Sequence, residues 1–322
     1  MSTLVFLEHH GGQLEKGPLG VLTKAATLGE SDVAGVLVGT AVRELASEAG
    51  KFGAAKVFVW DDPSLEAPLP QPRVDALATL VEQQGFDTVL FAGSVLAADV
   101  AAGLAARLDA GLNWDLVDLS VQDGDVVGKR PALQDTVYAD VGWKSTPRLA
   151  LFRSGSFDAS ASGGGEPEVE EFSAELREFS TAAAMVEQAH EESSGPALEE
   201  ADVIVAGGRG LGAPEKFTVV EELAKALGGA VGATRAVVDA GWYPYAHQIG
   251  QTGKTVSPKL YVAVGISGAI QHKVGMQGSN VIVAINKDSN APIFEYSDLA
   301  VVGDLHEIVP KLTELVRQKK GG

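Results

Sequence analysis

The sequence predicts an α/β protein with two doubly wound domains, each built on a mostly parallel sheet. Short apolar runs rich in β-branched residues alternate with helical segments along the chain, as in parallel strands joined by crossover helices. The chain has 322 residues, a length that suits two domains rather than one. Hydrophobic residues make up 45% of it, which is enough for a core in each half.

The first half contains one alternating series. Its predicted strands are nearly all apolar, as is typical of strands buried on both faces of a sheet. These strands cover residues 3–7, 35–38, 55–60, 88–92 and 148–152, and predicted helices cover residues 41–49, 73–84 and 95–108. A stretch rich in Ser, Gly and Ala at 154–168 predicts a mobile loop, and a strand is predicted after it at 169–172.

A polar stretch at residues 190–200 combines acidic residues with Ser, Gly and Pro. Such composition is typical of an exposed linker between domains. The predicted organisation is therefore an N-terminal α/β domain at 1–190, a linker at 191–200 and a second α/β domain at 201–322.

The second half repeats the alternation. Strands are predicted at residues 202–206, 236–238, 259–264 and 281–284, with a helix at 215–227. A last helix is predicted to begin near Asp304, because apolar residues then recur at spacings of three and four. That apolar face consists of Leu305, Ile308, Val309, Leu312, Leu315 and Val316.

Composition excludes several classes of function. A net charge of −18 disfavours nucleic acid and anionic membranes as partners. Without cysteine, the chain has no disulfide, no thiolate nucleophile and no cysteine-ligated metal, and its six histidines form no HExxH pair, so no metal site is predicted. No signal peptide and no membrane-spanning apolar run is found, so we expect a cytoplasmic protein without membrane insertion.

The first candidate binding motif is GGRGLGA, which starts at Gly207 between a predicted strand and a helix. Gly208, Gly210 and Ala213 match the loose form of the dinucleotide fingerprint, in which glycines let the backbone approach a pyrophosphate at a helix N-terminus. Arg209 would add a planar positive charge for phosphate oxygens. An ordinary tight turn between a strand and a helix explains the motif equally well.

A second motif, IGQTGKT, starts at Ile249. It ends like a P-loop but has Gln248 where the first glycine would stand, which disfavours ATP hydrolysis. The remaining interpretations are a loop that presents Gln251 and Thr252 to a ligand, or a surface turn.

The third motif, VGISGAIQH, starts at Val264 and joins a strand to a helix. Its Ser267 would add a hydroxyl to an anion site at the helix N-terminus, and His272 lies about one turn further on, where a structural role is the commoner one. Asn286 ends the next strand, and Asp304 starts the last helix as a good N-cap. All these motifs follow successive strands at the edge where doubly wound sheets bind ligands, so one large dinucleotide would contact them all.

Between Gly207 and Leu305 the strings GGRG, TRAVVDAG, IGQTGK, VGISGAIQH, INKD followed by APIF, and GDL occur in this order. In order and spacing this set closely resembles the alpha subunit of electron transfer flavoproteins. The N-terminal half agrees in architecture and in its LVFLEH opening. The resemblance implies a heterodimer with a beta subunit, which the N-terminal domain faces. It further implies FAD in a Rossmann-like C-terminal domain of this chain and AMP in the beta subunit.

The resemblance also implies the activity. Such a protein is an electron carrier rather than a stand-alone enzyme, and it takes electrons from dehydrogenases, typically the acyl-CoA dehydrogenases of fatty acid β-oxidation. It passes them to a membrane quinone reductase by way of an anionic flavin semiquinone, so no residue is catalytic in the bond-breaking sense.

Carried onto this chain, the family's FAD-binding set is Arg209, Thr234, Arg235, Ile249, Gly250, Gln251, Thr252, Ser267, Gly268, Ala269, Ile270, Gln271, His272, Asn286, Asp304 and Leu305. Three of these would tune the flavin, because an anionic flavin needs positive charge and donors nearby. The resemblance implies that Arg235 places its charge over the ring, His272 donates toward the C2 carbonyl and Thr252 donates toward N5. It assigns the ribityl, ribose and adenine parts to Ser267, Asn286 and Asp304.

Three other functions stay open on the sequence. The GRGLGA string favours an NAD-dependent dehydrogenase with Asp239 on the ribose, although Asp239 lies 26 residues beyond Ala213. A non-catalytic nucleotide-binding sensor would use the same motifs. A bifurcating or nitrogen-fixation type carrier of the same family differs mainly in its beta subunit.

Overall fold

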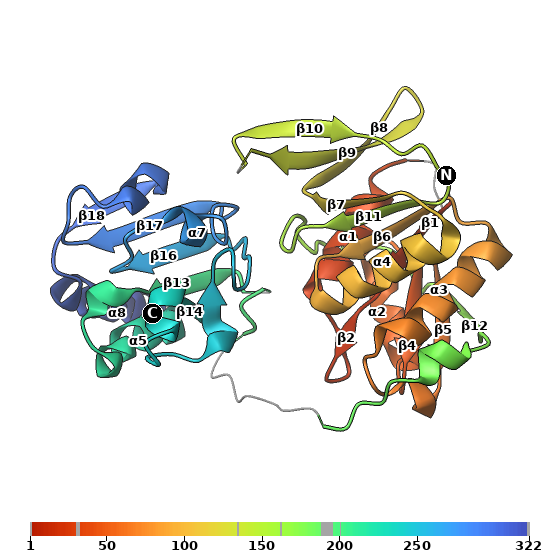
Figure 1. Cartoon of the computed structure of the whole chain (residues 1–322), viewed down its shortest axis with the longest axis horizontal. Coiled ribbons are helices and arrows are strands. Elements are labelled where there is room, and N and C mark those ends of the chain that lie inside the picture. Colours follow the sequence, from red (N-terminus) through yellow and green to blue (C-terminus); the bar gives the residue numbers. More distant parts are fainter. Residues whose placement is uncertain are drawn as a thin grey trace. The chain divides into compact units, whose positions relative to one another are not determined.

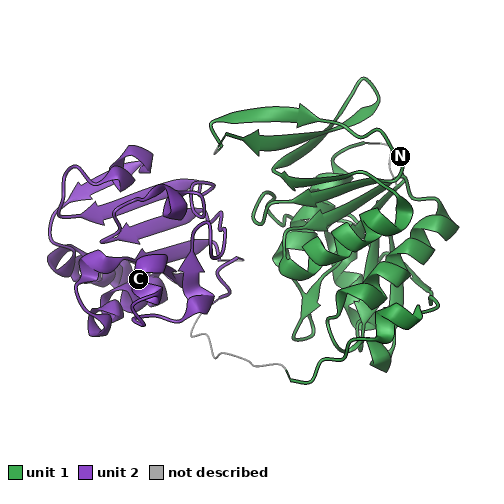
Figure 2. Cartoon of the chain, viewed as in Figure 1, with its two compact units in different colours: residues 1–189 green, residues 190–322 purple. Residues whose placement is uncertain are grey.

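The computed structural model describes residues 2–29, 33–133, 135–161, 163–187, 196–199 and 201–320. The chain divides into two compact units, Met1–Ala189 and His190–Gly322 (Figure 2). Of the predicted linker at 191–200, all but residues 196–199 lie outside the described residues, so its bounds stay a prediction. The predicted fold class is confirmed, since both units are built on large parallel sheets.

The first unit contains a seven-stranded sheet in the order β12-β5-β4-β1-β6-β11-β7, and each pairing in it is parallel (Figure 1). Its strands are β1 (Thr3–Phe6), β4 (Val33–Gly39), β5 (Lys56–Asp61), β6 (Thr88–Ala92), β7 (Leu112–Leu116), β11 (Arg148–Phe152) and β12 (Glu168–Glu171). Alternate residues enter different cores: Leu4 and Phe6 pack in one, Val5 and Leu7 in the other. Apolar side chains on both faces explain why these strands could be predicted.

Helices cover both faces of this sheet. The helices α3 (Pro70–Gln84) and α4 (Val95–Leu108) pack over one face, and α1 (Lys16–Ala26) with α2 (Ala46–Lys51) packs over the other. Short 3-10 turns lie at η1 (Arg43–Leu45), η2 (Pro63–Leu65) and η3 (Glu178–Thr181), and a small hairpin pairs β2 (His9–His10) with β3 (Gln13–Leu14).

The predicted mobile loop at 154–168 is anchored by side-chain contacts where the structure describes it. The ring of Phe157 packs edge-on against Phe152 with centroids 4.9 Å apart, and Lys24 lies over the same ring. Thr23 also donates a hydrogen bond to the Ser160 carbonyl.

An antiparallel sheet in the first unit was absent from the sequence prediction. It joins β8 (Asp118–Gln122), β9 (Asp125–Ala132) and β10 (Val137–Val141) in the order β10-β9-β8. Polar residues interrupt each of its strands, and β10 is almost entirely exposed, so they lack the buried apolar runs that marked the others. One signal could have found it: Asp123 and Gly124, both at positive φ, form a two-residue hairpin turn between β8 and β9.

The second unit contains a parallel six-stranded sheet in the order β15-β14-β13-β16-β17-β18 (Figure 1). Its strands are β13 (Val203–Gly207), β14 (Ala230–Thr234), β15 (Gln248–Ile249), β16 (Leu260–Val264), β17 (Val281–Asn286) and β18 (Leu299–Val302). Counted along the chain this is the order 3-2-1-4-5-6 of dinucleotide-binding sheets, whose direction of winding reverses between β13 and β16.

Two helices, α5 (Thr218–Leu227) and α8 (Leu305–Lys320), cover one face of this sheet and bury Val205, Val262 and their neighbours. The opposite face buries Tyr261 and Ile282 beneath the segment that includes η7 (Pro292–Tyr296). The remaining short helices are α6 (Arg235–Val238), α7 (Ile270–Lys273), η4 (Arg209–Leu211), η5 (Pro214–Phe217) and η6 (Tyr245–His247).

The predicted strand at residues 236–238 is wrong, because this segment belongs to the helix α6. The strand in this region is β14, which precedes α6. It was not predicted because Ala and Gly make up most of its residues. Gly232 packs closely there, since an added Cβ would lie 2.4 Å from the end of the Ile249 side chain of the adjoining strand. The edge strand β18 was also missed.

Within the part of the chain that the structure describes, no helix combines the length and apolar character needed to cross a membrane.

Candidate functional site

The site lies where the winding of the second sheet reverses. Two loops meet there, one after β13 and one after β16. The Gly208 N–H donates to the Val264 carbonyl at 3.0 Å, and the Gly210 N–H donates to the Gly265 carbonyl at 2.9 Å. The loops therefore touch backbone to backbone. A Cβ on Gly208 would lie 2.5 Å from the Gly265 oxygen, so the glycines of this motif are required by close approach.

Gly210→Ala is expected to destabilise the second unit by about 1–3 kcal/mol, as overpacking does. Its new Cβ would lie 2.7 Å from the Gly265 Cα, and backbone has less freedom to yield than a side chain. Thermal unfolding measures the effect. Gly142→Ala is the matched control, because no atom lies within 4 Å of its Cβ. Equal stability of the two variants would contradict the close packing of these loops.

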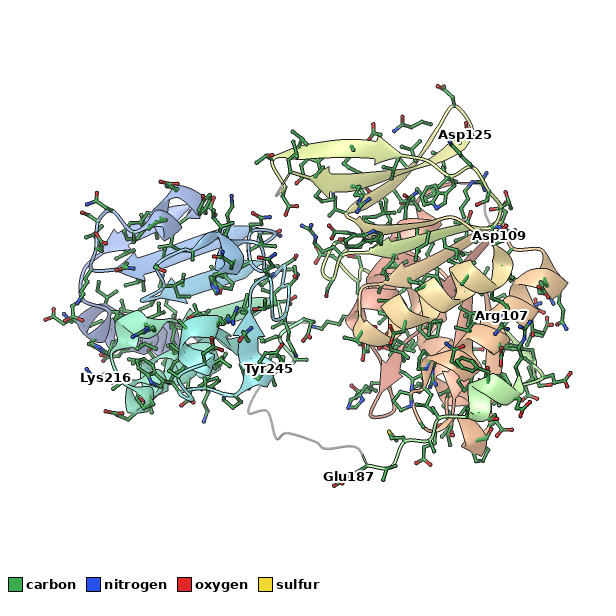
Figure 3. The ribbon with its side chains drawn as sticks, in the orientation of Figure 1. Arg107, Asp109, Asp125, Glu187, Lys216 and Tyr245 are labelled. Carbon is green, nitrogen blue, oxygen red and sulfur yellow. The ribbon has the colours of Figure 1, made fainter. Side chains whose placement is uncertain are left out.

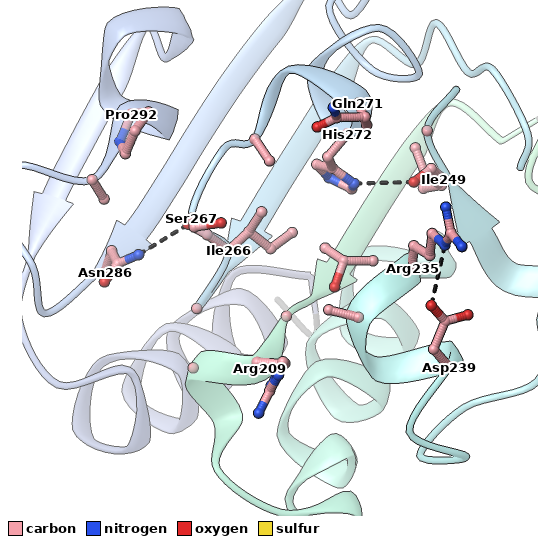
Figure 4. Close-up of a pocket in the computed structure, with 18 of the residues that line it drawn as sticks. Arg209, Arg235, Asp239, Ile249, Ile266, Ser267, Gln271, His272, Asn286 and Pro292 are labelled. Atoms are coloured by element: carbon pink, nitrogen blue, oxygen red, sulfur yellow. Dashed lines mark hydrogen bonds and ion pairs between the residues drawn. The ribbon is translucent and has the colours of Figure 1, made fainter. Parts of the chain in front are cut away.

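A pocket of about 640 Å³ opens at these loops (Figure 4). That volume is in the range of small-molecule and cofactor sites. Of the residues that the resemblance assigns to the ligand, those lining the pocket are Arg209, Thr234, Arg235, Ile249, Gly250, Gln251, Thr252, Ser267, Ala269, Gln271, His272 and Asn286.

Four residues of the expected set do not line the pocket. Gly268 packs against η7, where a Cβ would meet the Ile293 backbone nitrogen at 2.3 Å, and Ile270 is exposed. The Asp304 carboxylate accepts from the His306 N–H at 2.8 Å at the start of α8, and Leu305 is buried in the core beneath that helix. Their assignment to a ligand stays a prediction.

The structure adds lining residues that the expected set lacked. They are Gly208, Gly210, Ala236, Asp239, Gly265, Ile266, Asp288, Ala291 and Pro292. Several belong to strings quoted above, so their motifs were a usable signal. Ala291 and Pro292 lie at η7 and belong to the APIF string.

Several polar groups of the pocket have no partner among the residues that the structure describes. The Arg209 guanidinium, the hydroxyls of Thr234 and Ser267, and the Gln251 side-chain amide make no hydrogen bond or ion pair with any described residue. The backbone N–H groups of Ser267 and Ala269 likewise donate to no described residue. Since polar groups in folded proteins are rarely left unpaired, this set of mostly donor groups is suited to a ligand rich in acceptors.

One charged pair lies in the pocket wall. Arg235 begins α6 and its Nε donates to an Asp239 carboxylate oxygen at 3.1 Å, one turn along (Figure 4). Both side chains are more than half exposed, so water screens the attraction and the pair adds little stability. The remaining guanidinium nitrogens have no partner among the described residues, and the positive charge is available to a ligand.

His272 is buried and both of its ring nitrogens are engaged. A carbonyl oxygen only accepts, so Nδ1 donates to the Ile249 oxygen at 3.0 Å and Nε2 accepts from the Tyr261 hydroxyl at 2.9 Å. Burial lowers the pKa of His272 to about 4, against a smaller opposing effect of the Ile249 carbonyl, so the ring is neutral near pH 7. In this arrangement both ring nitrogens are engaged within the protein, and the expected donation toward a flavin C2 carbonyl stays a prediction. The neighbouring strand β16, through Tyr261, supplies a partner that sequence spacing did not indicate.

His272 is expected to make the stability of the second unit depend on pH. Its pKa is lower in the folded state than the ordinary 6.5, so the unfolded chain binds more protons between about pH 6.5 and pH 4. The stabilising contribution of the neutral His272 ring is therefore fully present above this window. It falls as the pH drops through the window, by at most about 1.4 kcal/mol per pH unit. His272→Gln should flatten this slope in chemical unfolding curves. Equal slopes in the two proteins would contradict the burial of a neutral ring.

Asn286 uses its amide to hold the loops. Its Nδ2 donates to the Ile266 carbonyl at 2.9 Å, and its Oδ1 accepts from the Asp288 N–H at 3.0 Å. Its place in the wall is thereby fixed. Within the described ranges, no group of three or more His, Asp or Glu side chains could hold a metal ion.

Two family models match this chain. One, described as "Electron transfer flavoprotein FAD-binding domain", matches residues 197–277, and the other, described as "Electron transfer flavoprotein domain", matches residues 3–176.

Curated relatives match nearly the whole chain. It is 42% identical to "Electron transfer flavoprotein subunit alpha" of Mycobacterium leprae, with 99% of each chain covered. It is 40% identical to the protein of that name from Bacillus subtilis, with 98% of this chain and 97% of the relative covered. It is 34% identical to "Protein FixB" of Clostridium saccharobutylicum, over 98% of this chain and 95% of the relative.

Proposed function

The chain belongs to the family of electron transfer flavoprotein alpha subunits, and we propose that its second unit holds FAD in the pocket where β13 and β16 diverge. The observation that carries this proposal is the set of polar groups there that have no partner among the described residues. FAD has phosphate, ribose and ribityl oxygens and a ring with several acceptor atoms. The residues present fit this group.

Different residues of the pocket would contact different parts of the FAD. Arg209 and the backbone of the GGRG loop would face the pyrophosphate, because close glycine backbone and a planar cation suit phosphate oxygens. Ser267 and its backbone N–H would hold hydroxyl-bearing parts. Arg235 and Thr252, on the β14–β15 side of the pocket, would face the ring.

Bound FAD would supply the redox chemistry, taking and giving electrons singly. The protein then needs charge and donors fixed in place, not a base that removes a substrate proton. Arg235 provides the positive charge and Thr252 provides a hydroxyl. His272 is held neutral by burial and contributes packing rather than charge.

The first unit supports the assignment by contrast. At the equivalent edge of its sheet the polar groups are paired with one another. Glu8 and Ser94, which follow the neighbouring strands β1 and β6, share a hydrogen bond of 2.5 Å. The Asp61 carboxylate accepts the N–H groups of Ala41, Val42 and Arg43, so these donors are already paired within the protein.

The proposed carrier works with partners. It pairs with a beta subunit that carries AMP, and its first unit faces that subunit. It receives electrons in the cytoplasm from dehydrogenases, typically the acyl-CoA dehydrogenases of fatty acid β-oxidation, and delivers them to a membrane quinone reductase through an anionic flavin semiquinone. The family membership and the many hydrogen-bond donors in the pocket wall support this proposal.

A second candidate is a nitrogen-fixation or bifurcating carrier of the same family. The match to "Protein FixB" favours it. Reduction by NADH that depends on the beta subunit and feeds two separate acceptors would select this candidate over the first.

Ligand titration of the flavin-depleted two-chain protein tests the cofactor assignment. FAD is expected to bind at one molecule per alpha chain, with much weaker binding of FMN, which lacks the AMP portion. Ser267→Ala should weaken binding by about three- to tenfold, because one hydrogen bond is lost. Binding of NAD with NADH turnover by the chain alone would support a dehydrogenase instead. Binding of AMP or ATP without FAD would support a sensor.

A further inference from the structure

We propose that Gln248 is a positioning residue that turns the Thr252 hydroxyl so that it donates into the pocket. The proposal rests on the proposed function, since the acceptor that it serves is the bound flavin ring. It concerns a side chain outside the expected FAD-binding set and outside the pocket lining.

The contact itself is specific. Gln248 lies on β15 and is only 2% exposed. Its Nε2 donates to the Thr252 backbone oxygen at 2.9 Å and lies 3.2 Å from the Thr252 hydroxyl oxygen. A backbone carbonyl accepts and never donates, so the NH₂ end of the amide must face Thr252. Its two hydrogens then serve the carbonyl and the hydroxyl.

The direction of this bond decides what the hydroxyl does next. A threonine hydroxyl has one hydrogen and two acceptor positions. Because Gln248 donates to it, the hydrogen of the hydroxyl is left for another partner. No other described residue accepts it, and Thr252 lines the pocket, so the hydrogen is available to an acceptor on the ligand. An amide oxygen in the same place would instead accept a hydrogen bond from the hydroxyl, and no hydrogen would remain for the ligand.

The loop around Thr252 is closed upon Gln248. The Lys254 N–H donates to the Gln248 carbonyl at 2.7 Å, and the Gly253 N–H donates to the Gly250 carbonyl at 2.9 Å. A Cβ on Gly253 would lie 2.3 Å from the Gln248 oxygen, so a glycine is needed for this closure. Gln248 therefore fixes both the backbone and the side chain of Thr252.

Tyr245 offers a control within the same loop. Tyr245 is labelled in Figure 3. Its hydroxyl donates to the same Thr252 carbonyl at 2.9 Å, but it makes no hydrogen bond with the Thr252 hydroxyl. It shares the loop-holding part of the Gln248 contact and lacks the part that orients the hydroxyl.

The test uses the FAD-loaded two-chain protein and measures the one-electron reduction potential by spectroelectrochemistry, with FAD affinity measured beside it. The variants are Gln248→Met, Tyr245→Phe, Thr252→Val and the double variant Gln248→Met with Thr252→Val. Losing one hydrogen bond should change the equilibrium between oxidised and one-electron-reduced flavin by about three- to tenfold. We expect Gln248→Met to shift the potential in the same direction as Thr252→Val, and Tyr245→Phe to leave it unchanged.

The double variant decides whether Gln248 acts through the hydroxyl. If it does, the double variant has the potential of Thr252→Val alone, because residues that act through one contact are not additive. Additive shifts, or a shift in Tyr245→Phe as large as that in Gln248→Met, would overturn the proposal and leave Gln248 as a loop support. Should Gln248→Met fail to fold, Gln248→Asn replaces it with the same expectation, because its uncharged amide is one methylene too short to keep the contact with the Thr252 hydroxyl.

Failure of the proposed function gives a different result. In that case the unaltered protein would not bind FAD at all. A protein that binds FAD normally, with a potential insensitive to Gln248, would retain the function and reject only the role of this residue.

Discussion

Arg235→Ala is expected to lower the one-electron reduction potential of the bound FAD by about 60–130 mV while FAD stays bound. A hydrogen bond to a charged group contributes about 1.5–3 kcal/mol, and tenfold in an equilibrium corresponds to about 1.4 kcal/mol or about 59 mV for one electron. Part of the Arg235 guanidinium has no partner within the described ranges of the chain and lies in the pocket wall, so its charge can stabilise a flavin that gains negative charge. Redox titration of the purified two-chain protein measures the shift.

Asp239→Asn supplies the control of opposite sign. The Asp239 carboxylate pairs with Arg235 and partly offsets its charge. Removing only the carboxylate's charge should therefore raise the potential. If Arg235→Ala leaves the potential unchanged, or if both variants shift it in the same direction, Arg235 does not act on the flavin through its charge.

Asp75→Ala is expected to destabilise the first unit by about 3–5 kcal/mol, because it leaves a largely buried cation unpaired. Asp75 lies on α3 and is 2% exposed. One oxygen accepts from Arg107 of α4, which is labelled in Figure 3, at 2.7 Å, and the other accepts from the Arg177 backbone N–H at 2.9 Å. The carboxylate thus ties two helices to the segment before η3. Asp140→Ala removes an exposed pair with Lys129 and should change stability by less than about 0.5 kcal/mol.

The same carboxylate should appear in acid unfolding. Burial alone would raise the pKa of Asp75, but the nearby Ser180 hydroxyl, the Arg177 N–H and the Arg107 guanidinium together hold the pKa below its ordinary value of 3.8. Its stabilisation is therefore complete above the ordinary value and is lost as the pH falls through the lower folded pKa. Asp75→Asn should show a smaller loss of stability below about pH 4. An identical acid limb in both proteins would contradict this assignment.

The sequence predicted the elements that are apolar on both faces. The bounds of the strands β6 and β11 were predicted correctly. Their successive residues enter the two cores in turn, so each strand is an almost continuous apolar run. The antiparallel strands β8 to β10 were missed because they are polar and partly exposed: β8 and β9 bury only some of their residues, and β10 buries none, so no apolar run marks them. At residues 236–238 the β-branched pair Val237 and Val238 suggested a strand, yet tertiary packing places Val237 in the core from a helix.

The site was predictable where backbone geometry demands particular residues. Gly208 and Gly210 are required by close approach of two loops, and such needs leave a sequence signal. Roles that depend on neighbouring residues from other strands left no such signal in the sequence. The motif placed His272 at the pocket, which it lines. Its hydrogen bond with Tyr261 arises from the packing of the neighbouring strand, which the motif does not indicate. The support that Gln248 gives to Thr252 arises in the same way.

The visible spectrum during stepwise reduction tests the central claim most directly. The chain should be produced together with its beta-type partner and titrated with electrons under exclusion of oxygen. The account predicts a yellow complex that passes through a red anionic semiquinone before full reduction. A colourless complex, or one that is reduced only by NADH and shows no semiquinone, would contradict it.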